Sequence, residues 1–480
     1  MFSPEDYTIT AHFLPRLYGL IFLFAIGPFL FQIRGLIGIN GILPAATFLA
    51  RIKMRYPQQY YYYVPTLFWI NSSNGALVGA AFCGVVLSIG LMLGFYPSLL
   101  LFLLYLIYLS IVSVGQDFLS FGWEGFLLEG AIYTFLISLT PTPTLMSWIC
   151  INILLFRFYF HAGLVKLQSG DPNWKNLTAI FYHYQSQPLP NAIAWYIHKL
   201  PLWFHKTSVI LMFAIELGAS FGIFGPDLVR TGVFAAFFFL QWSIWVTGNF
   251  SYLNHLSVIL STILLNNSTL SSFMPLPMAE LPGPSILEEP ISVLAGVFIL
   301  LQLMQIWRQL RLSPSFLYSR FQRWLMMCSF YHIANPYGIF AVMTTSRIEI
   351  IIEGSEDGEQ WKEYAFPYKP SEVARRPRRI SPYQPRLDWQ AWFLPFDSIP
   401  DAWFEYFLYH LLKGTPEVLG LLRVNPFPDH PPKYLRAMKY DYRFSTFAEK
   451  KQTGHWWVRN YVGLYCPAIM LRARKEITSA

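Results

Sequence analysis

The chain has 480 residues, a length that allows two or three domains, and 54% of them are hydrophobic while only 13% are charged. Soluble domains usually carry about 25% charged residues, so this composition excludes a wholly soluble protein. The net charge is +8, but no basic helix or aromatic RNA-binding signature accompanies it, and we expect no nucleic-acid partner.

Long apolar runs fill residues 1–307, which we expect to form a multi-pass transmembrane helical domain. A bilayer core takes about 20 apolar residues per helix, and on that length the sequence predicts nine spans, two of them short. No internal repeat is evident, which disfavours a secondary transporter. The expected spans are 17–33, 75–95, 99–114, 124–139, 145–166, 207–224, 230–248, 250–265 and 289–307.

Two loops between the expected spans are long. Loop 34–74 contains an amphipathic stretch, Ile42 to Tyr56, which carries three basic residues and is followed by a cluster of tyrosines. Tyrosines near a membrane end are typical interface anchors. Loop 167–206 is polar and marked by several prolines.

Ionisable side chains inside the spans are informative because a charge in hydrocarbon is costly. Arg157 and His161 are four residues apart and so share one helix face. We expect a carboxylate from another span to pair with Arg157. In an alternative interpretation these residues line a polar chamber in which His161 or Lys166 transfers protons, although a lysine at a helix end can also reach the headgroups. The remaining ionisable residues of this set are Glu124, Glu129 and Glu216.

The segment GQDFLSFGWE (115–124) is a polar turn that leads into a span. We expect Asp117 and Ser120 to cap that helix, with Glu124 in its first turn. Of the four cysteines, Cys83 and Cys150 lie in apolar runs and are expected to be buried, inert thiols. Nothing in the spacing of the other two, Cys328 and Cys466, argues for a disulfide, although they could pair in an oxidising compartment.

After a juxtamembrane connector (308–345), residues 346–480 change to a period-two pattern and predict a soluble β-rich (α+β) domain. Residues 347–353 read as a strand, Asp357-Gly358 as a turn, and 361–368 as the returning strand of a hairpin. One or two helices over 401–423 and a strand over 434–444 follow. For Asp388 and Trp389, a packed loop and a partner-binding site are both open interpretations.

Five segments of the chain resemble the lipase maturation factor family, in the family's order and over roughly residues 110–445. They are GQDFLSFGWEGFLLE (115–129), FRFYFHAGLVKLQSGDPNWKNLTAIFYHYQSQPLPN (156–191), YGIFAVMTTSRIEIIIEGSEDGEQWKEYAFPYKP (337–370), PRRISPYQPRLDWQAWF (377–393) and NPFPDHPPKYLRAMKYDYRF (425–444).

The resemblance implies a membrane-anchored protein that assists the folding and assembly of secreted lipases and is not an enzyme. It implies a lipase client and membrane lipid as partners, no cofactor, and a platform formed by loop 167–206 with the C-terminal domain. The membrane would be the endoplasmic reticulum in a eukaryote and the inner membrane in a bacterium. The candidate partner-binding or structural residues are Asp117, Glu129, Arg157, Asp171, Trp174, His183, Gln187, Asp388 and Trp389.

A shorter segment, His161-Ala-Gly-Leu-Val-Lys166-Leu with Asp171 and Trp174 after it, is similar to part of the vitamin K-dependent gamma-carboxylase group. In that group a lysine at the position of Lys166 acts in base chemistry. The similarity covers about fifteen residues and implies a common membrane scaffold. The alternative function is a carboxylase-like membrane enzyme that acts on a lipid-soluble substrate, with Lys166 as base and His161 nearby.

Two arguments about topology disagree. Basic residues in loops 34–74 and 167–206 would place both loops and the C-terminal domain in the cytoplasm by the positive-inside rule. The family resemblance implies the lumenal side, where a lipase folds, and we follow the resemblance. Glycosylation sequons provide a test: two start in the long loops, at Asn71 and Asn176, and two in loop 266–288, at Asn266 and Asn267.

Overall fold

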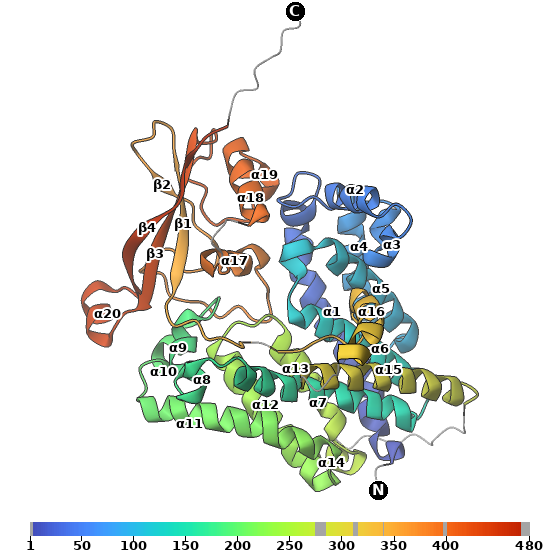
Figure 1. Ribbon diagram of the computed structural model, residues 1–480. Helices are drawn as coiled ribbons and strands as arrows, with labels where there is room; N and C mark the ends of the chain where they lie inside the picture. The colour runs from blue at the N-terminus through green and yellow to red at the C-terminus, as the bar shows by residue number, and fades with distance from the viewer. Residues whose placement is uncertain (1–2, 274–284, 311–314, 339, 397–400, 472–480) are drawn as a thin grey trace, which may run out of the picture.

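The computed structural model describes residues 3–273, 285–310, 315–338, 340–396 and 401–471. A helical domain is followed by a smaller domain with a sheet, and Figure 1 shows the two side by side. The helices of the first part are α1 (Thr8–Ile37), α2 (Ala45–Arg55), α3 (Tyr60–Tyr63), α4 (Asn74–Met92), α5 (Pro97–Val114), α6 (Gly122–Ser138), α7 (Leu145–Gln168), α8 (Pro172–Lys175), α9 (Ala179–Ser186), α10 (Ala192–Ile197), α11 (Leu202–Phe213), α12 (Asp227–Thr247), α13 (Leu253–Ser261), α14 (Asn267–Phe273), α15 (Glu288–Gln309) and α16 (Ser315–Phe330).

Among the described residues, seven helical segments are long and apolar enough to cross a bilayer. They confirm seven of the nine expected spans and make the chain a multi-pass membrane protein. The other two expected spans are shorter helices: α6 has 17 residues, and α13 with the turn after it covers Leu253–Leu264. The seven segments are Pro4–Ile37, Asn74–Met92, Pro97–Val114, Leu145–Gln168, Leu202–Phe224, Asp227–Thr247 and Glu288–Gln309.

The ends of these helices gather on two opposite sides of the helical domain. On one side, which we call the N-terminal face, the Tyr7 hydroxyl donates to Asp227 at the start of α12 over 2.9 Å. The Thr10 hydroxyl donates to the Leu265 carbonyl, just after α13, also over 2.9 Å. The ends of α5 and α6 that meet on this face are joined by a bond from the Ser98 hydroxyl to the Ser138 carbonyl.

The second side, the C-domain face, carries the sheet domain. Gln32, near the end of α1, donates to the Gln384 carbonyl over 2.9 Å. Asn249, between α12 and α13, accepts a bond from the Ile380 N–H over 2.9 Å. The short helices α6 and α13 therefore each run from the C-domain face to the N-terminal face, so nine segments alternate between the two sides.

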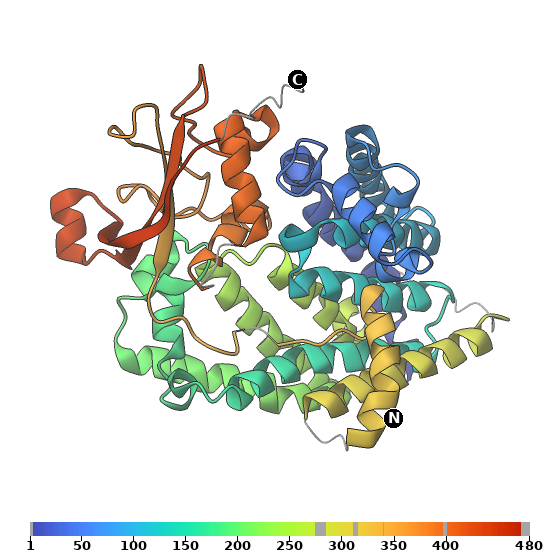
Figure 2. The same cartoon turned by 45° about the horizontal axis from the view of Figure 1, so that its top comes forward.

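The C-terminal domain contains an antiparallel four-stranded sheet of order β2-β1-β3-β4. The strand expected over 347–353 is confirmed as β1, and the strand expected over 434–444 is confirmed as β3 at the same bounds. The returning strand expected over 361–368 is wrong in length, because only the two residues of β2 pair with β1. Figure 2 shows the orange helices of this domain lying between the sheet and the first helices of the chain, which are blue. The elements are β1 (Ile348–Ser355), β2 (Lys362–Glu363), α17 (Arg386–Ala391), α18 (Ala402–Lys413), α19 (Pro416–Leu419), β3 (Tyr434–Phe444), α20 (Phe447–Thr453) and β4 (Trp457–Ile469).

The turn before α6 and the cysteines differ from expectation. Phe121 stands at the N-cap of α6 without a side-chain cap, because a 3-10 turn over Gln116–Leu119 keeps Asp117 and Ser120 away from the first free N–H groups of the helix. The expected cap is therefore wrong. Cys83 is exposed on α4, toward the bilayer rather than the core, whereas Cys150 is buried as expected. All four cysteines are free, which leaves the alternative Cys328–Cys466 disulfide unformed.

Candidate functional site

The candidate site residues lie mainly where the C-terminal domain meets the helical domain. Arg157 on α7 pairs with Glu129 on α6 at 2.6 Å, and both side chains are fully buried. The expected carboxylate partner of Arg157 is thereby confirmed. Glu129 also accepts the Asn335 backbone N–H at 2.7 Å and the Tyr337 hydroxyl at 2.6 Å. This pair thus holds connector residues Asn335 and Tyr337 inside the helical domain, where backbone groups need such partners.

His161 lies on α7 one turn beyond Arg157, but it does not join this pair. The His161 side chain is fully buried, and neither ring nitrogen has a hydrogen-bond partner among the described residues. The structure therefore brings no acid, nucleophile or metal ligand to His161 in the part of the chain that it describes.

Lys166, in the last turn of α7, forms a second buried ion pair, and its ammonium lies 2.7 Å from the Glu216 carboxylate. Glu216 lies in a π-helical segment, Ala214–Gly218, which interrupts the helix that starts as α11. The Lys166 ammonium also donates to the Ala162 carbonyl and lies 5.6 Å from the centre of the Trp174 ring. Lys166 therefore does not reach to the headgroups. Its donors are held by a carboxylate and a carbonyl, as expected for a structural ion pair.

Loop 167–206 folds into α8, α9 and α10 beside the sheet (Figure 1), and its candidate residues fasten the connector. Asp171 accepts the Met343 N–H at 2.6 Å and caps α8. Burial opposes ionisation of Asp171, but the N–H groups of Met343 and Asn173 outweigh it and lower the pKa of the carboxyl. Trp174 donates to the Ala341 carbonyl at 3.1 Å.

Two further candidates of this loop pack against the end of α12 and the turn that follows it. His183 stacks on Phe250, with ring centres 5.9 Å apart, and burial together with the Lys166 charge lowers its pKa to about 4. A neutral ring suits this apolar contact. Gln187 donates to the Thr247 carbonyl at 2.9 Å. Both residues therefore connect the loop to the membrane helices.

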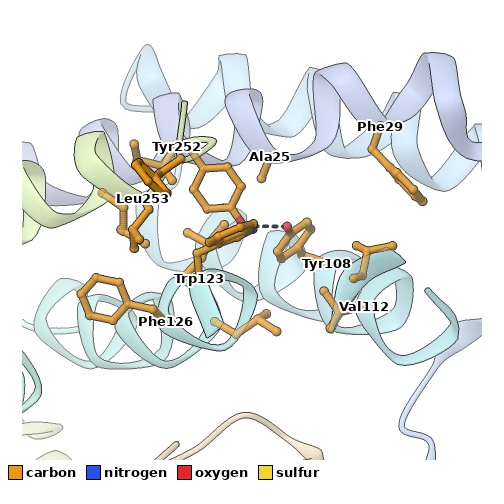
Figure 3. Packing of buried hydrophobic residues seen from close by; sticks show 14 of the residues in the cluster. Ala25, Phe29, Tyr108, Val112, Trp123, Phe126, Tyr252 and Leu253 are labelled. Atoms are coloured by element: carbon orange, nitrogen blue, oxygen red, sulfur yellow. Dashed lines mark hydrogen bonds between the residues drawn. The ribbon is translucent and has the colours of Figure 1, made fainter. Parts of the chain in front are cut away.

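A third buried ion pair joins α17 of the C-terminal domain to α6. Arg386 lies 2.7 Å from Glu124, and both side chains are almost fully buried. Glu124 also accepts bonds from Tyr108, Tyr252 and Trp123. Figure 3 shows the rings of Tyr108 and Tyr252 converging beside Trp123, with the two hydroxyls 2.9 Å apart. α17 is therefore held against the ends of α1 and α6, and its Arg386 side chain reaches between Phe29 of α1 and Glu124 of α6.

Asp388 and Trp389 belong to the same helix, all of whose residues are buried, so the structure favours the packed interpretation for both. Asp388 accepts the N–H groups of Tyr368 and Lys369 at 2.6 and 2.8 Å. Its burial raises the pKa of the carboxyl to about 6, although these two bonds act in the opposite direction. Trp389 is buried, and its ring meets that of Trp123 edge-on with centres 5.1 Å apart.

Arg347 is a structural residue that the sequence reasoning missed. Its guanidinium donates to the carbonyls of Gln185, Gln187 and Pro188 and pairs with Glu349 at 2.6 Å. The available signal was a basic residue directly before an apolar strand, inside a segment of family resemblance. Asp117, in contrast, lies exposed in the turn before α6 and takes no part in the junction.

The chemistry of these residues is that of a scaffold. Buried ion pairs centred on Glu124, Glu129, Glu216 and Glu349 hold the helices and the C-terminal domain in one arrangement. Removing two charges from water costs free energy, but a buried pair fixes the arrangement of the elements that carry the charges.

Comparison with known proteins assigns both parts of the chain. The family model of the lipase maturation factor transmembrane domain matches residues 9–272, and that of the lipase maturation factor C-terminal domain matches residues 333–467. Lipase maturation factor 1 of Homo sapiens is 32% identical over 92% of this chain and 84% of its own length. Lipase maturation factor 2 of Xenopus laevis is 30% identical over 95% and 82%, respectively. No solved structure matches. Since two family models together cover most of the chain, it belongs to the lipase maturation factor family.

Proposed function

We propose that this protein is a membrane-anchored maturation factor that assists the folding and assembly of a secreted lipase. The proposal rests on the similarity to proteins named lipase maturation factors over both domains. In a eukaryote the membrane would be that of the endoplasmic reticulum, with the C-domain face toward the lumen, and in a bacterium it would be the inner membrane.

A continuous aromatic surface supports loop 167–206 and the C-terminal domain as the client platform. Tyr196 of α10 is 49% exposed and Phe447 of α20 is 59% exposed, with ring centres 6.5 Å apart. Trp456 lies 6.3 Å from Tyr196 and is partly exposed. We call these three residues the aromatic patch. Exposed aromatic side chains are typical of surfaces that bind other proteins, and a folding lipase exposes apolar segments that such a patch can contact.

A rescue assay tests this function. In cells that lack the chain, a co-expressed secreted lipase should be inactive and aggregated, and the wild-type chain should restore its secretion. The double variant Tyr196→Ser/Phe447→Ser should fail to restore it at equal protein level, whereas the matched control Tyr409→Ser, which changes another exposed tyrosine of the C-terminal domain, should succeed. Normal lipase secretion without the chain would refute the proposal.

The carboxylase-like alternative receives no support. The reported relatives carry the lipase maturation name, and the residue on which the alternative depends, Lys166, is held by Glu216. We propose that the protein acts by binding, without catalysing a reaction. Arg347, which pairs with Glu349 of β1 and donates to three carbonyls of loop 167–206, keeps this loop and the sheet in fixed register as one surface.

A further inference from the structure

A basic groove lies beside the aromatic patch and is not part of it. It is a hollow of about 420 Å³ between the start of α10 and the segment that follows the β1–β2 hairpin. Asn191, Ala192 and Ile193 form one wall. The other wall is Arg376 to Arg379, in which three of four residues are arginine.

The three groove arginines, Arg376, Arg378 and Arg379, are exposed and form no ion pair with any carboxylate in the part of the chain that the structure describes. The guanidinium of Arg376 lies over the Trp456 ring and that of Arg379 over the Trp245 ring, the latter at 3.5 Å. Ring contacts orient a guanidinium but leave its charge and its N–H donors available. The groove thus presents three positive charges that no carboxylate of the described residues neutralises.

The groove is fixed at the membrane boundary. Trp245 lies two residues from the end of α12, a helix long and apolar enough to span the bilayer. The Asn249 amide, just beyond this end, donates to the Arg378 carbonyl at 2.9 Å, and the Asn191 amide donates to the Val246 carbonyl at 3.0 Å. Both walls are therefore tied to the C-terminal end of the same spanning helix or to the residues just after it.

The positive charge of the groove and its position at the membrane boundary together indicate which ligand it binds. Basic residues at this level meet phospholipid headgroups, and a guanidinium binds a phosphate through two parallel hydrogen bonds. Trp242, exposed on the same helix, and Ile193, exposed on the groove wall, are suited to the start of the acyl chains. We propose that this groove binds the phosphate headgroup of an anionic phospholipid on the C-domain face of the membrane.

Lipid binding by the purified full chain tests this assignment. The measured quantities are lipid retained in native mass spectrometry and thermal stabilisation in detergent by added phosphatidylglycerol, phosphatidylcholine or inorganic phosphate. Phosphatidylglycerol should bind and stabilise the wild type most. The triple variant Arg376→Gln/Arg378→Gln/Arg379→Gln should bind it more weakly by roughly a hundredfold, from the loss of three charges near the headgroups.

Two matched variants separate the groove from general charge and from misfolding. Lys413→Gln/Lys433→Gln/Lys451→Gln removes three exposed charges elsewhere in the C-terminal domain and should leave lipid binding unchanged. Ile193→Glu adds a carboxylate to the wall, keeps every arginine, and should weaken binding as well. Equal lipid affinity of the wild type and the triple arginine variant would overturn the proposal. Equal stabilisation by inorganic phosphate would replace the lipid with a free anion and would also overturn it.

Discussion

Replacing Arg386 with methionine should loosen the attachment of the C-terminal domain to the membrane helices. Methionine keeps an apolar stem against Phe29, over whose ring the guanidinium now lies at 5.3 Å, but it removes the partner of Glu124. The Glu124 side chain has no exposed surface, so its charge would remain buried without a counter-charge.

The size of this effect follows from the contacts of Glu124. Removing one partner of a buried ion pair costs about 3–5 kcal/mol. Tyr108, Tyr252 and Trp123 still donate to Glu124 in the variant, so we expect the lower end, about 3 kcal/mol. The double variant Arg386→Met/Glu124→Gln removes the stranded charge and should recover most of the loss, because a buried pair replaced by neutral groups is often neutral in stability.

Unfolding by denaturing detergent in mixed micelles measures the free energy, and limited proteolysis reports release of the C-terminal domain. The matched control is Arg423→Met, which breaks the partly exposed pair with Glu372 and should cost less than about 1 kcal/mol. The reasoning is refuted if the single and double variants lose the same free energy, because the stranded charge would then not be the cause.

The remaining predictions concern Lys166, Asp388 and the sequons. Lys166→Met/Glu216→Gln should retain lipase maturation at normal protein level in the rescue assay; complete loss in a well-folded protein would count against a scaffold role. The pKa of Asp388 is raised from 3.8 to about 6 in the folded protein, so folding takes up a proton and this group makes the protein more stable as the pH falls. Between about pH 7.5 and about pH 5 the gain is about 1 kcal/mol, and Asp388→Asn should abolish it in unfolding measured at both pH values. In microsomes, glycans should appear at the exposed Asn71 or Asn176 and not at the sequons on the N-terminal face, whereas modification at Asn266 or Asn267 alone would reverse the topology.

The length of the apolar segments predicted most of the helical domain, because a helix that crosses a bilayer needs about 20 apolar residues. This length does not show whether a segment contacts lipid or protein. The segment 250–265 is apolar because α13 is packed inside the bundle, where nearly all of its residues are buried. A helix buried by protein and one buried by lipid have the same composition, so the sequence predicted this short span but could not show that protein rather than lipid surrounds it.

The ion pair of Arg157 was predictable because an unpaired charge inside a membrane span has a high free-energy cost. The sequence offered three carboxylates as candidate partners. The partner of Glu124 was not predictable, because Arg386 is 262 residues away and lies in the soluble part of the chain by every local signal. The packing of α17 on the ends of the membrane helices, and of the connector inside the helical domain, is a tertiary event without a local pattern. The strands β1 and β3 were predictable because their alternation is local.

Site-specific photo-crosslinking tests the central claim most directly. A photoreactive phenylalanine analogue would replace Tyr196 or Phe447 in the aromatic patch, or Leu228, which is exposed on the N-terminal face. In cells that co-express a newly made secreted lipase, the account predicts lipase adducts from Tyr196 and Phe447 and none from Leu228. Adducts from Leu228 alone, or none from the patch in cells whose lipase secretion requires the chain, would contradict it.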